Sequence, residues 1–359
     1  MSRVVMLLLV LCLARTAHSQ AWPGEQWPRA LAPASAPVAA LEAYAFGPRD
    51  EASHQGVRTD ALLVVHDGRI VYERYAAPTT ADTVHGTWSI SKSLMASVLG
   101  VAFGEGRFNL QDAAADYYHP LDPHRAIRMA DLLQWASGLK WQEGYEYAPL
   151  NSSVIAMLYT RGRRDMAAYA AARGSFAEPG EVFRYSSGDS NLLAAILRNM
   201  VGAHDYPEYP WKALFEPLGI HHAVWETDAS GTFVASSYAY LTAQDLARVG
   251  LLMLRDGQWQ GRQLLPTAWV EFNRTPYAGG GLEPGEPVPG GHWWLNTGLA
   301  WPAAPASTFA ALGHWGQALY VLPDEKLVVV RFADDRDGSY NHNLLLERVL
   351  AAFGPGSTP

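Results

Sequence analysis

The stretch TWSISKSL, residues 87 to 94, places Ser89 three residues before Lys92. On a helix, residues three apart lie on one face, so the hydroxyl and the amine are expected to be neighbours. A serine hydroxyl is a weak nucleophile until a base removes its proton. A lysine can be that base if burial and the positive end of a helix lower its pKa, whereas arginine does not deprotonate in proteins. We therefore predict Ser89 as a nucleophile and Lys92 as its general base.

The choice of lysine is informative because the chain carries four lysines and 23 arginines. Spacing alone proves little, however, since Ser137 and Lys140 form a second Ser-x-x-Lys. That copy follows the predicted helix ADLLQWA, and Gly138 is typical of a C-terminal helix stop. We expect Ser137 and Lys140 on a turn with no helical face to share, which leaves Ser89 as the stronger candidate.

A second motif, Tyr185-Ser186-Ser187, stands between a predicted turn and the predicted helix SNLLAAIL. From a loop opposite Ser89 and Lys92, Tyr185 could relay a proton to the leaving group, with the lysine favouring its phenolate form. Taken alone, one tyrosine among 17 is more often a packed residue. With the first motif beside it, we predict Tyr185 as the relay and Ser187 as a substrate contact.

A third motif, His314-Trp315-Gly316, opens the predicted strand GQALYVL. A glycine here would let the backbone approach a ligand, so His314 and Gly316 are predicted substrate contacts. We also predict that the N–H groups of Ser89 and Gln317 form an oxyanion hole. Taken alone, a histidine at a strand start is more often a satisfied polar residue than a catalytic one.

Two tryptophans, Trp88 and Trp315, flank these motifs. They are expected either to form an apolar wall for an acyl chain or to belong to the core. The loop of residues 278 to 291 is rich in Gly and Pro. It is expected either to shape the entrance of the cleft or to be an ordinary surface loop.

The three motifs, in this order and at these spacings, resemble those of the class C β-lactamase and penicillin-binding-protein superfamily. The resemblance runs from about residue 55 to 355 through stretches such as LLQWASGLKW, FRYSSGDSNLLAAIL and GHWGQALYVLPDEKLVVV. These stretches look most like the 6-aminohexanoate-dimer hydrolase and family VIII carboxylesterase branch. The resemblance implies a serine hydrolase that works through an acyl-enzyme.

Two positions depart from the β-lactamase pattern, which has lysine where this chain has His314 and asparagine where it has Ser187. The lost lysine removes a cation that would hold a substrate carboxylate. The sequence therefore favours hydrolysis of an ester or a linear amide. Two alternatives stay open: a D-amino-acid peptidase or weak β-lactamase, and a non-catalytic module that binds cell-wall peptides.

The elements that must position these residues follow from hydrophobic patterning. ALLVVHDGRIVYERYA predicts a β-hairpin turned at Asp67-Gly68, and LMASVLGVAFGEG predicts a buried helix. Helical patterns dominate the middle of the chain, and β-runs with a last helix end it. We predict an α/β (α+β) serine β-lactamase-like fold, with an antiparallel sheet built from both chain ends, flanking helices and an inserted helical domain.

These patterns also suggest boundaries along the chain. We expect a signal peptide over 1–19, an extended arm over 20–55, a discontinuous α/β domain over 56–106 and 229–355, and a helical domain over 107–228. The first residues have a basic start, a short apolar run and small residues before a cut near Ser19-Gln20, which predicts a secreted or periplasmic protein without a stable membrane anchor.

Composition narrows the possible partners. The net charge is −8 with no concentrated basic face, so no nucleic-acid partner is predicted. The 12 histidines include no HExxH, and the only cysteine, Cys12, lies in the predicted signal peptide, so no metal or other cofactor is predicted. The expected partner is a small ester, amide or short peptide substrate. The oligomeric state is not predicted.

Overall fold

The computed structural model describes residues 21–145 and 149–354. The predicted signal peptide lies outside the described residues. Among the helices in the described ranges, none combines the length and the apolar character that a membrane span needs.

A seven-stranded antiparallel sheet forms the centre of the α/β part, in the order β2-β1-β12-β11-β10-β9-β8. Its strands are β1 (Thr59–His66), β2 (Arg69–Tyr75), β8 (Val288–Pro289), β9 (Trp294–Leu295), β10 (Phe309–Gly313), β11 (Gln317–Leu322) and β12 (Leu327–Ala333). Val64 of β1 lies opposite Val329 of β12, so the two ends of the chain meet in the sheet. The predicted α/β fold with a sheet from both termini is confirmed.

The predicted hairpin is present and turns where the sequence indicates. Asp67 and Gly68 have φ values of 47° and 79°. Two residues with positive φ are what a type I′ turn requires, and this turn suits the right-handed twist of paired strands.

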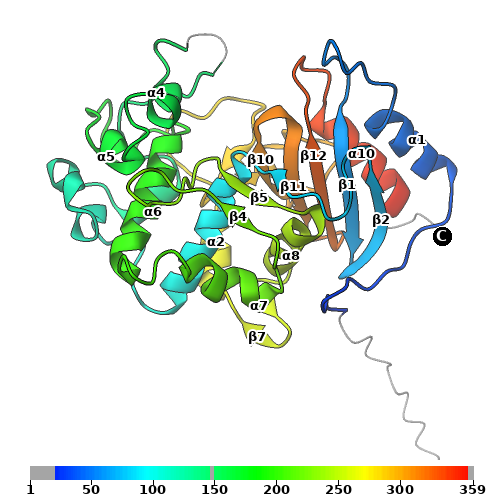
Figure 1. Ribbon diagram of the computed structural model, residues 1–359, viewed down its shortest axis with the longest axis horizontal. Helices are drawn as coiled ribbons and strands as arrows, with labels where there is room; N and C mark the ends of the chain where they lie inside the picture. The colour runs from blue at the N-terminus through cyan, green and yellow to red at the C-terminus, as the bar shows by residue number, and fades with distance from the viewer. Residues whose placement is uncertain (1–20, 146–148, 355–359) are drawn as a thin grey trace, which may run out of the picture.

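Helices cover both faces of the sheet because the buried strands are apolar on both sides. Leu62 and Val64 pack with α1 (Ala36–Ala45) and α10 (His342–Phe353) on one face. On the other face, Leu63 and Val65 belong to the larger core, which includes α2 (Ile90–Gly104) and α8 (Ala243–Leu254). Figure 1 shows α1 and α10 together beyond β1 and β2, with the helical part of the chain at the opposite side.

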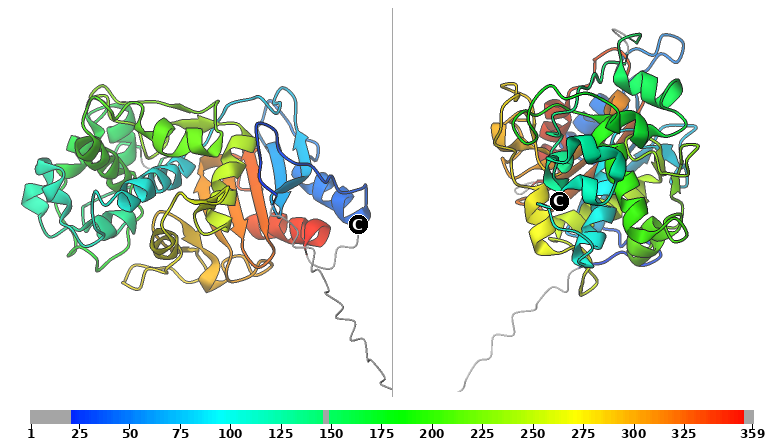
Figure 2. Two further views of the ribbon diagram at one scale, coloured as in Figure 1. Left: turned by 90° about the horizontal axis from the view of Figure 1, so that it is seen from below. Right: turned by 90° about the vertical axis from the view of Figure 1, so that its left-hand side faces the viewer.

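The helical part contains most of the remaining elements. Its helices are α3 (Met129–Leu133), α4 (Ser153–Tyr159), α5 (Met166–Ala171), α6 (Ser187–Val201) and α7 (Glu216–Leu218), with a π-helical turn over Trp211–Phe215 before α7. The elements elsewhere are α9 (Thr267–Asn273) and the short strands β3 (His85–Gly86), β4 (Val224–Trp225), β5 (Ala239–Leu241), β6 (Gln258–Trp259) and β7 (Arg262–Gln263). Both views of Figure 2 show α2 (cyan) beside this helical part.

The N-terminal segment differs from its prediction. Residues 20–55 are expected to be extended, yet Ala36–Ala45 form α1. Ser35 caps this helix by accepting a hydrogen bond from the Val38 N–H, and a proline lies in the first turn. The expectation of an extended arm is therefore wrong for this stretch, because alanine and a capped start outweigh the prolines. The predicted domain boundaries stay a prediction.

Candidate active site

Ser89 stands at the start of α2, directly after β3 and a tight turn. Trp88 before it has a φ of 49°, a left-handed conformation that costs free energy for a residue other than glycine. Ser89 occupies the N-cap position, but its side chain makes no capping hydrogen bond to the helix. The Ser89 hydroxyl is therefore free of the helix backbone and can interact with other groups.

Lys92, one turn along α2, is 1% exposed. Its Nζ lies 2.9 Å from Ser89 Oγ and donates a 2.8 Å hydrogen bond to the Ser236 carbonyl. Burial lowers the pKa of Lys92 to about 8, although the Glu143 carboxylate acts in the opposite direction. The predicted pair is thus in hydrogen-bonding contact, and its amine is far easier to deprotonate than an exposed lysine.

Tyr185 lies beside Lys92, whose Nζ is 4.9 Å from the centre of the phenol ring. Trp135 and Trp294 hold the ring in place with centroid distances of 4.9 and 5.4 Å. Burial and the Glu143 carboxylate raise the pKa of Tyr185 above its ordinary value, and a hydrogen bond with Ser89 opposes them only in part. This environment favours the neutral phenol of Tyr185 over the expected phenolate.

Ser187 is fully buried at the start of α6, and its N–H and hydroxyl are hydrogen-bonded to Glu143. The Ser187 N–H donates to Glu143 Oε2 at 3.0 Å, and the Ser187 hydroxyl donates to Oε1. Trp141 Nε1 donates to the same carboxylate. The group that reaches the cavity here is Glu143, rather than the predicted Ser187.

His314 is the member of the third motif that lies at the cavity. Its ring stacks on Tyr145 with a centroid distance of 5.2 Å and meets Trp88 edge-on at 5.3 Å. It follows Gly313, the last residue of β10, so the end of this strand faces Ser89 across the cavity.

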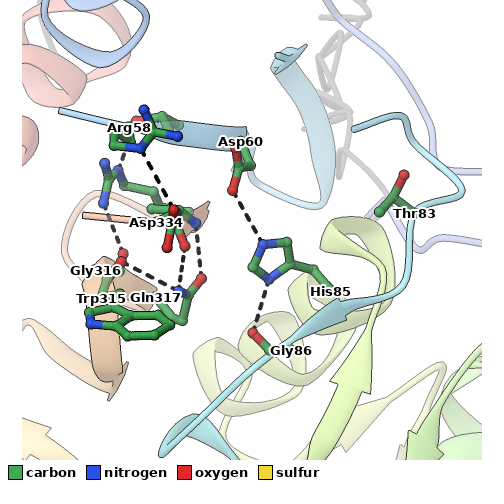
Figure 3. A network of polar contacts seen from close by, with 12 residues as sticks. Arg58, Asp60, Thr83, His85, Gly86, Trp315, Gly316, Gln317 and Asp334 are labelled. Atoms are coloured by element: carbon green, nitrogen blue, oxygen red, sulfur yellow. Dashed lines mark hydrogen bonds and ion pairs between the residues drawn. The ribbon is translucent and has the colours of Figure 1, made fainter. Parts of the chain in front are cut away.

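Gly316 and Gln317 have a structural setting that differs from the predicted one. Gly316 has a φ of 84°, and the Arg331–Asp335 ion pair packs against its Cα. The Gln317 side chain (Figure 3) is buried. Its amide donates to the Ala333 carbonyl at 2.6 Å, and its carbonyl accepts from the Ala333 N–H at 2.9 Å. Neither residue is among the described residues that line the cavity.

The same network fixes the turn between β10 and β11. Arg331 Nη1 donates a 3.0 Å hydrogen bond to the Gly316 carbonyl, and the Asp335 N–H donates to the Trp315 carbonyl at 3.2 Å. The glycine is therefore required for packing and for its backbone conformation, and the buried ion pair holds the turn that carries His314.

Replacing Gly316 with alanine tests this assignment. The added Cβ would lie 2.1 Å from Asp335 Oδ2 and 2.4 Å from Arg331 Nη1, in a left-handed backbone conformation. We expect a loss of about 2–4 kcal/mol in the free energy of unfolding, measured with denaturant. Gly106→Ala is the matched control, since its φ is 71° with nothing within 4 Å, and it should lose only about 1 kcal/mol. Equal losses in the two variants would show that the ion pair does not constrain Gly316.

Trp88 and Trp315 pack on each other edge-to-face at 5.2 Å. The Arg336 guanidinium covers Trp315, 4.2 Å from its ring centre. Among the described residues, Trp294, Leu312 and Pro287 supply the apolar lining of the cavity, and the two predicted tryptophans do not. The expectation of an apolar wall from Trp88 and Trp315 is therefore not supported.

The cavity beside Ser89 has a volume of about 340 Å³. Its described lining combines catalytic candidates, two carboxylates and apolar side chains: Ser89, Glu143, Tyr145, Tyr185, Glu286, Pro287, Trp294, Leu312, Gly313 and His314. Glu286 and Pro287 come from the loop of residues 278–291, so this loop shapes one side of the cavity. The three motifs meet here through Ser89, Tyr185 and His314.

The second Ser-x-x-Lys forms no such pair. The Ser137 hydroxyl is buried and donates to Asp189 Oδ1 at 2.9 Å, whereas Lys140 is exposed. Gly138 has a φ of 75°, as expected for a helix stop. The prediction that Ser137 and Lys140 share no helical face is confirmed.

Sequence reasoning missed Glu143, Tyr145, Glu286 and Trp294. Glu143 and Tyr145 follow the Ser137 decoy in an irregular segment with no periodic pattern. Only the fold brings them beside Ser89. Glu286 lies in a loop that the sequence singled out, and its charge was the one available signal.

Comparison with known proteins gives a consistent family. The model of the Beta-lactamase family matches residues 38–352. The 6-aminohexanoate-dimer hydrolase of Paenarthrobacter ureafaciens is 26% identical over 328 residues, which covers 85% of this chain and 80% of the relative.

Solved structures show the same fold. A protein from Bacillus anthracis, provisionally assigned as a 6-aminohexanoate-dimer hydrolase, has a TM-score of 0.68 at 24% identity and covers 88% of this chain and 84% of its own. EstCE1, a hydrolase with promiscuous acyltransferase activity, has a TM-score of 0.70 at 16% identity over 89% of this chain and 98% of its own. A class C β-lactamase in complex with cefoxitin has a TM-score of 0.60 at 17% identity over 81% and 92%.

Proposed function

Because this chain belongs to the beta-lactamase family of serine hydrolases, we propose that it cleaves ester or linear amide bonds through an acyl-enzyme on Ser89. The contact of Lys92 Nζ with Ser89 Oγ at 2.9 Å carries this proposal. A fully buried lysine beside a serine that does not cap its helix has no evident structural purpose, whereas a general base needs this geometry.

The acylation step uses three groups in turn. Lys92 takes the hydroxyl proton as Ser89 Oγ bonds to the substrate carbonyl carbon, and the carbonyl electron pair moves onto oxygen. When the intermediate collapses, the bond to the leaving group breaks and Tyr185 gives that group its proton. Lys92 then gives the proton it took from Ser89 to Tyr185, so that the neutral amine and the neutral phenol are both restored. Water repeats the sequence to release the acid.

An oxyanion hole must stabilise the charge on the carbonyl oxygen. The Ser89 N–H at the start of α2 is one candidate donor, as predicted. Since Gln317 does not line the cavity, we place the second donor in the backbone of Gly313 or His314, which line it where β10 ends.

The rate should follow the deprotonation of Lys92. With a pKa of about 8, roughly one lysine in ten is neutral at pH 7 and most are neutral at pH 9. We expect kcat/KM for a neutral ester to rise about tenfold per pH unit below pH 7 and to level off above pH 9. A pH–rate profile between pH 5.5 and 10 measures this, and a flat profile would contradict the role of Lys92.

Glu143→Gln provides a directional check on that profile. The Glu143 carboxylate raises the pKa of Lys92, so removing its charge should move the rising limb to lower pH. Gln142→Glu adds a carboxylate at the neighbouring exposed position and should move the limb little. If the rising limb does not move in Glu143→Gln, the Glu143 carboxylate does not influence the pKa of the base.

A comparison of substrates tests the reaction class. We expect turnover of short-chain nitrophenyl esters and of the linear 6-aminohexanoate dimer, with little turnover of a cephalosporin or a D-Ala-D-Ala peptide. The last two substrates carry a carboxylate next to the scissile amide, and the described cavity lining offers no lysine or arginine to pair with it. In the linear dimer, five methylene groups separate the carboxylate from the amide. Efficient cephalosporin or D-Ala-D-Ala turnover would instead support the β-lactamase or peptidase alternative.

We further propose that the protein is exported and loses its first 19 residues. The support is the pattern of the first residues: a basic start, a short apolar run and small residues before Gln20. N-terminal sequencing of protein from the periplasm or medium of an expressing bacterium should read from Gln20. Retention of Met1 in cytoplasmic protein would overturn this.

A further inference from the structure

A second pocket, separate from the cavity beside Ser89, lies between the N-terminal segment and the start of α8. It has a volume of about 400 Å³, and the two cavities have no described lining residue in common. Its lining comes from four segments, within residues 25–29, 81–82, 219–222 and 242–248. We infer that this pocket is a binding site for a small organic cation with two separated charges, such as a linear alkyl diamine.

Asp245 supplies the buried carboxylate of the second pocket. It stands in the first turn of α8 and is 5% exposed. Neither of its carboxylate oxygens accepts a hydrogen bond from a described residue, and its ion-pair contacts are long, 3.5 Å to His222 Nδ1 and 3.8 Å to Arg248 Nε. A buried carboxylate costs free energy unless donors satisfy it. Asp245 therefore has acceptor capacity for a donor that enters the pocket.

The arginines of the second pocket are already engaged by protein acceptors. The Arg248 guanidinium is buried and donates to the carbonyls of Leu218 at 2.9 Å and Gly24 at 2.8 Å. Arg29 is paired with the Glu73 carboxylate. An entering anion would therefore find few donors here, whereas an entering cation finds a carboxylate that lacks them.

Two further carboxylates, Glu25 and Asp82, form the exposed rim of the second pocket. Within the described ranges, neither side chain takes part in a salt bridge or a hydrogen bond. With the Arg29–Glu73 pair counted as neutral, the lining carries three carboxylates against one arginine. The potential inside the pocket is therefore negative when its histidines are neutral.

The separation of these carboxylates selects the kind of cation. Among the described residues, no three His, Cys, Asp or Glu side chains are grouped closely enough to hold a metal ion, so the carboxylates do not converge on one point. A linear diamine instead places one ammonium group at the buried Asp245 and the other at the rim. Trp27 and Ala81 in the lining supply apolar surface for the methylene groups between the two charges.

Four probes with four carbons each and different end groups test the charge requirement. Putrescine carries two ammonium groups, 4-amino-1-butanol one, 1,4-butanediol none, and succinate carries two carboxylates. Isothermal titration calorimetry at pH 8 keeps imidazoles ordinarily neutral and alkylammonium groups charged. We expect putrescine to bind with a Kd below about 1 mM and 4-amino-1-butanol at least about tenfold more weakly. The diol and succinate should not bind, and added salt should weaken putrescine binding.

Charge variants assign the binding to the second pocket. Asp245→Asn keeps the side-chain shape and should weaken putrescine binding at least tenfold. Glu25→Gln combined with Asp82→Asn should weaken putrescine several-fold and leave 4-amino-1-butanol little changed, because the monoamine needs only Asp245. Glu286→Gln is the matched control, since it removes an equally exposed carboxylate from the cavity beside Ser89. It should leave the Kd for putrescine unchanged.

The outcomes are decisive in each direction. The inference is overturned if putrescine does not bind, if the diol or succinate binds as well, or if Glu286→Gln weakens binding as much as Asp245→Asn. If circular dichroism shows that Asp245→Asn does not fold, the variant with both rim carboxylates replaced decides, and an unchanged Kd there overturns the inference. Ser89→Ala should bind putrescine like the parent, so this result is independent of the proposed hydrolysis.

Discussion

Ser89→Ala should reduce ester turnover by at least about 1,000-fold. The alanine removes the atom that bonds to the substrate and leaves the helix start unchanged, since the Ser89 side chain makes no capping bond. Steady-state kinetics with a neutral nitrophenyl ester measure the loss. Thermal unfolding should show a melting temperature close to that of the parent.

The second Ser-x-x-Lys provides the control. Ser137→Ala removes a hydroxyl that bonds to Asp189, away from the cavity, and should keep turnover within a few-fold of the parent. If Ser137→Ala and Ser89→Ala lose activity equally, the motif at residue 89 is not the reacting one.

Lys92→Arg should lose activity by at least about 1,000-fold, although it keeps a positive charge at this position. The reason is chemical: a guanidinium does not release its proton at any working pH, so the Ser89 hydroxyl would have no base. Because arginine is larger and the site is closed, Lys92→Met serves as a second variant of similar length. Both should be inactive, and Met should not raise activity above Arg at any pH.

Lys140→Arg is the matched exchange at an exposed lysine and should be fully active. Circular dichroism and thermal unfolding establish that each Lys92 variant is folded. A folded Lys92→Arg enzyme with normal turnover would show that Lys92 holds a charge and does not move a proton.

Much of the fold follows from local patterns that the tertiary structure respects. The Asp67-Gly68 turn dictates the first hairpin, and the apolar run after Ser89 becomes a helix buried almost all round. Local patterns do not indicate strand β10 or helix α1, because the first is short and the second is rich in alanine. Their state depends on the neighbours they pack against, which the sequence alone does not reveal.

The site was predictable where motif residues contact each other. Ser89, Lys92 and Tyr185 come from two distant segments and meet as expected. Reasoning from residue type does not account for Ser187 and Gly316, because other side chains, Glu143 and the Arg331–Asp335 pair, contact them. Such partners come from segments without a motif, so their effect appears only in three dimensions.

The charge of the cavity, too, could be predicted only in part from the sequence. The missing lysine of the third motif indicated that a substrate carboxylate would lack a partner. The acidic replacement, formed by Glu143 and Glu286, required the fold to bring an irregular segment and a loop to Ser89.

Covalent labelling tests the central claim most directly, namely that Ser89 forms the acyl-enzyme with Lys92 as base. A fluorophosphonate probe followed by peptide mass spectrometry should place one label on Ser89. Labelling should be abolished in Ser89→Ala and strongly slowed in Lys92→Arg. A label on Ser137 or another residue, or labelling at the parent rate in Lys92→Arg, would contradict the account.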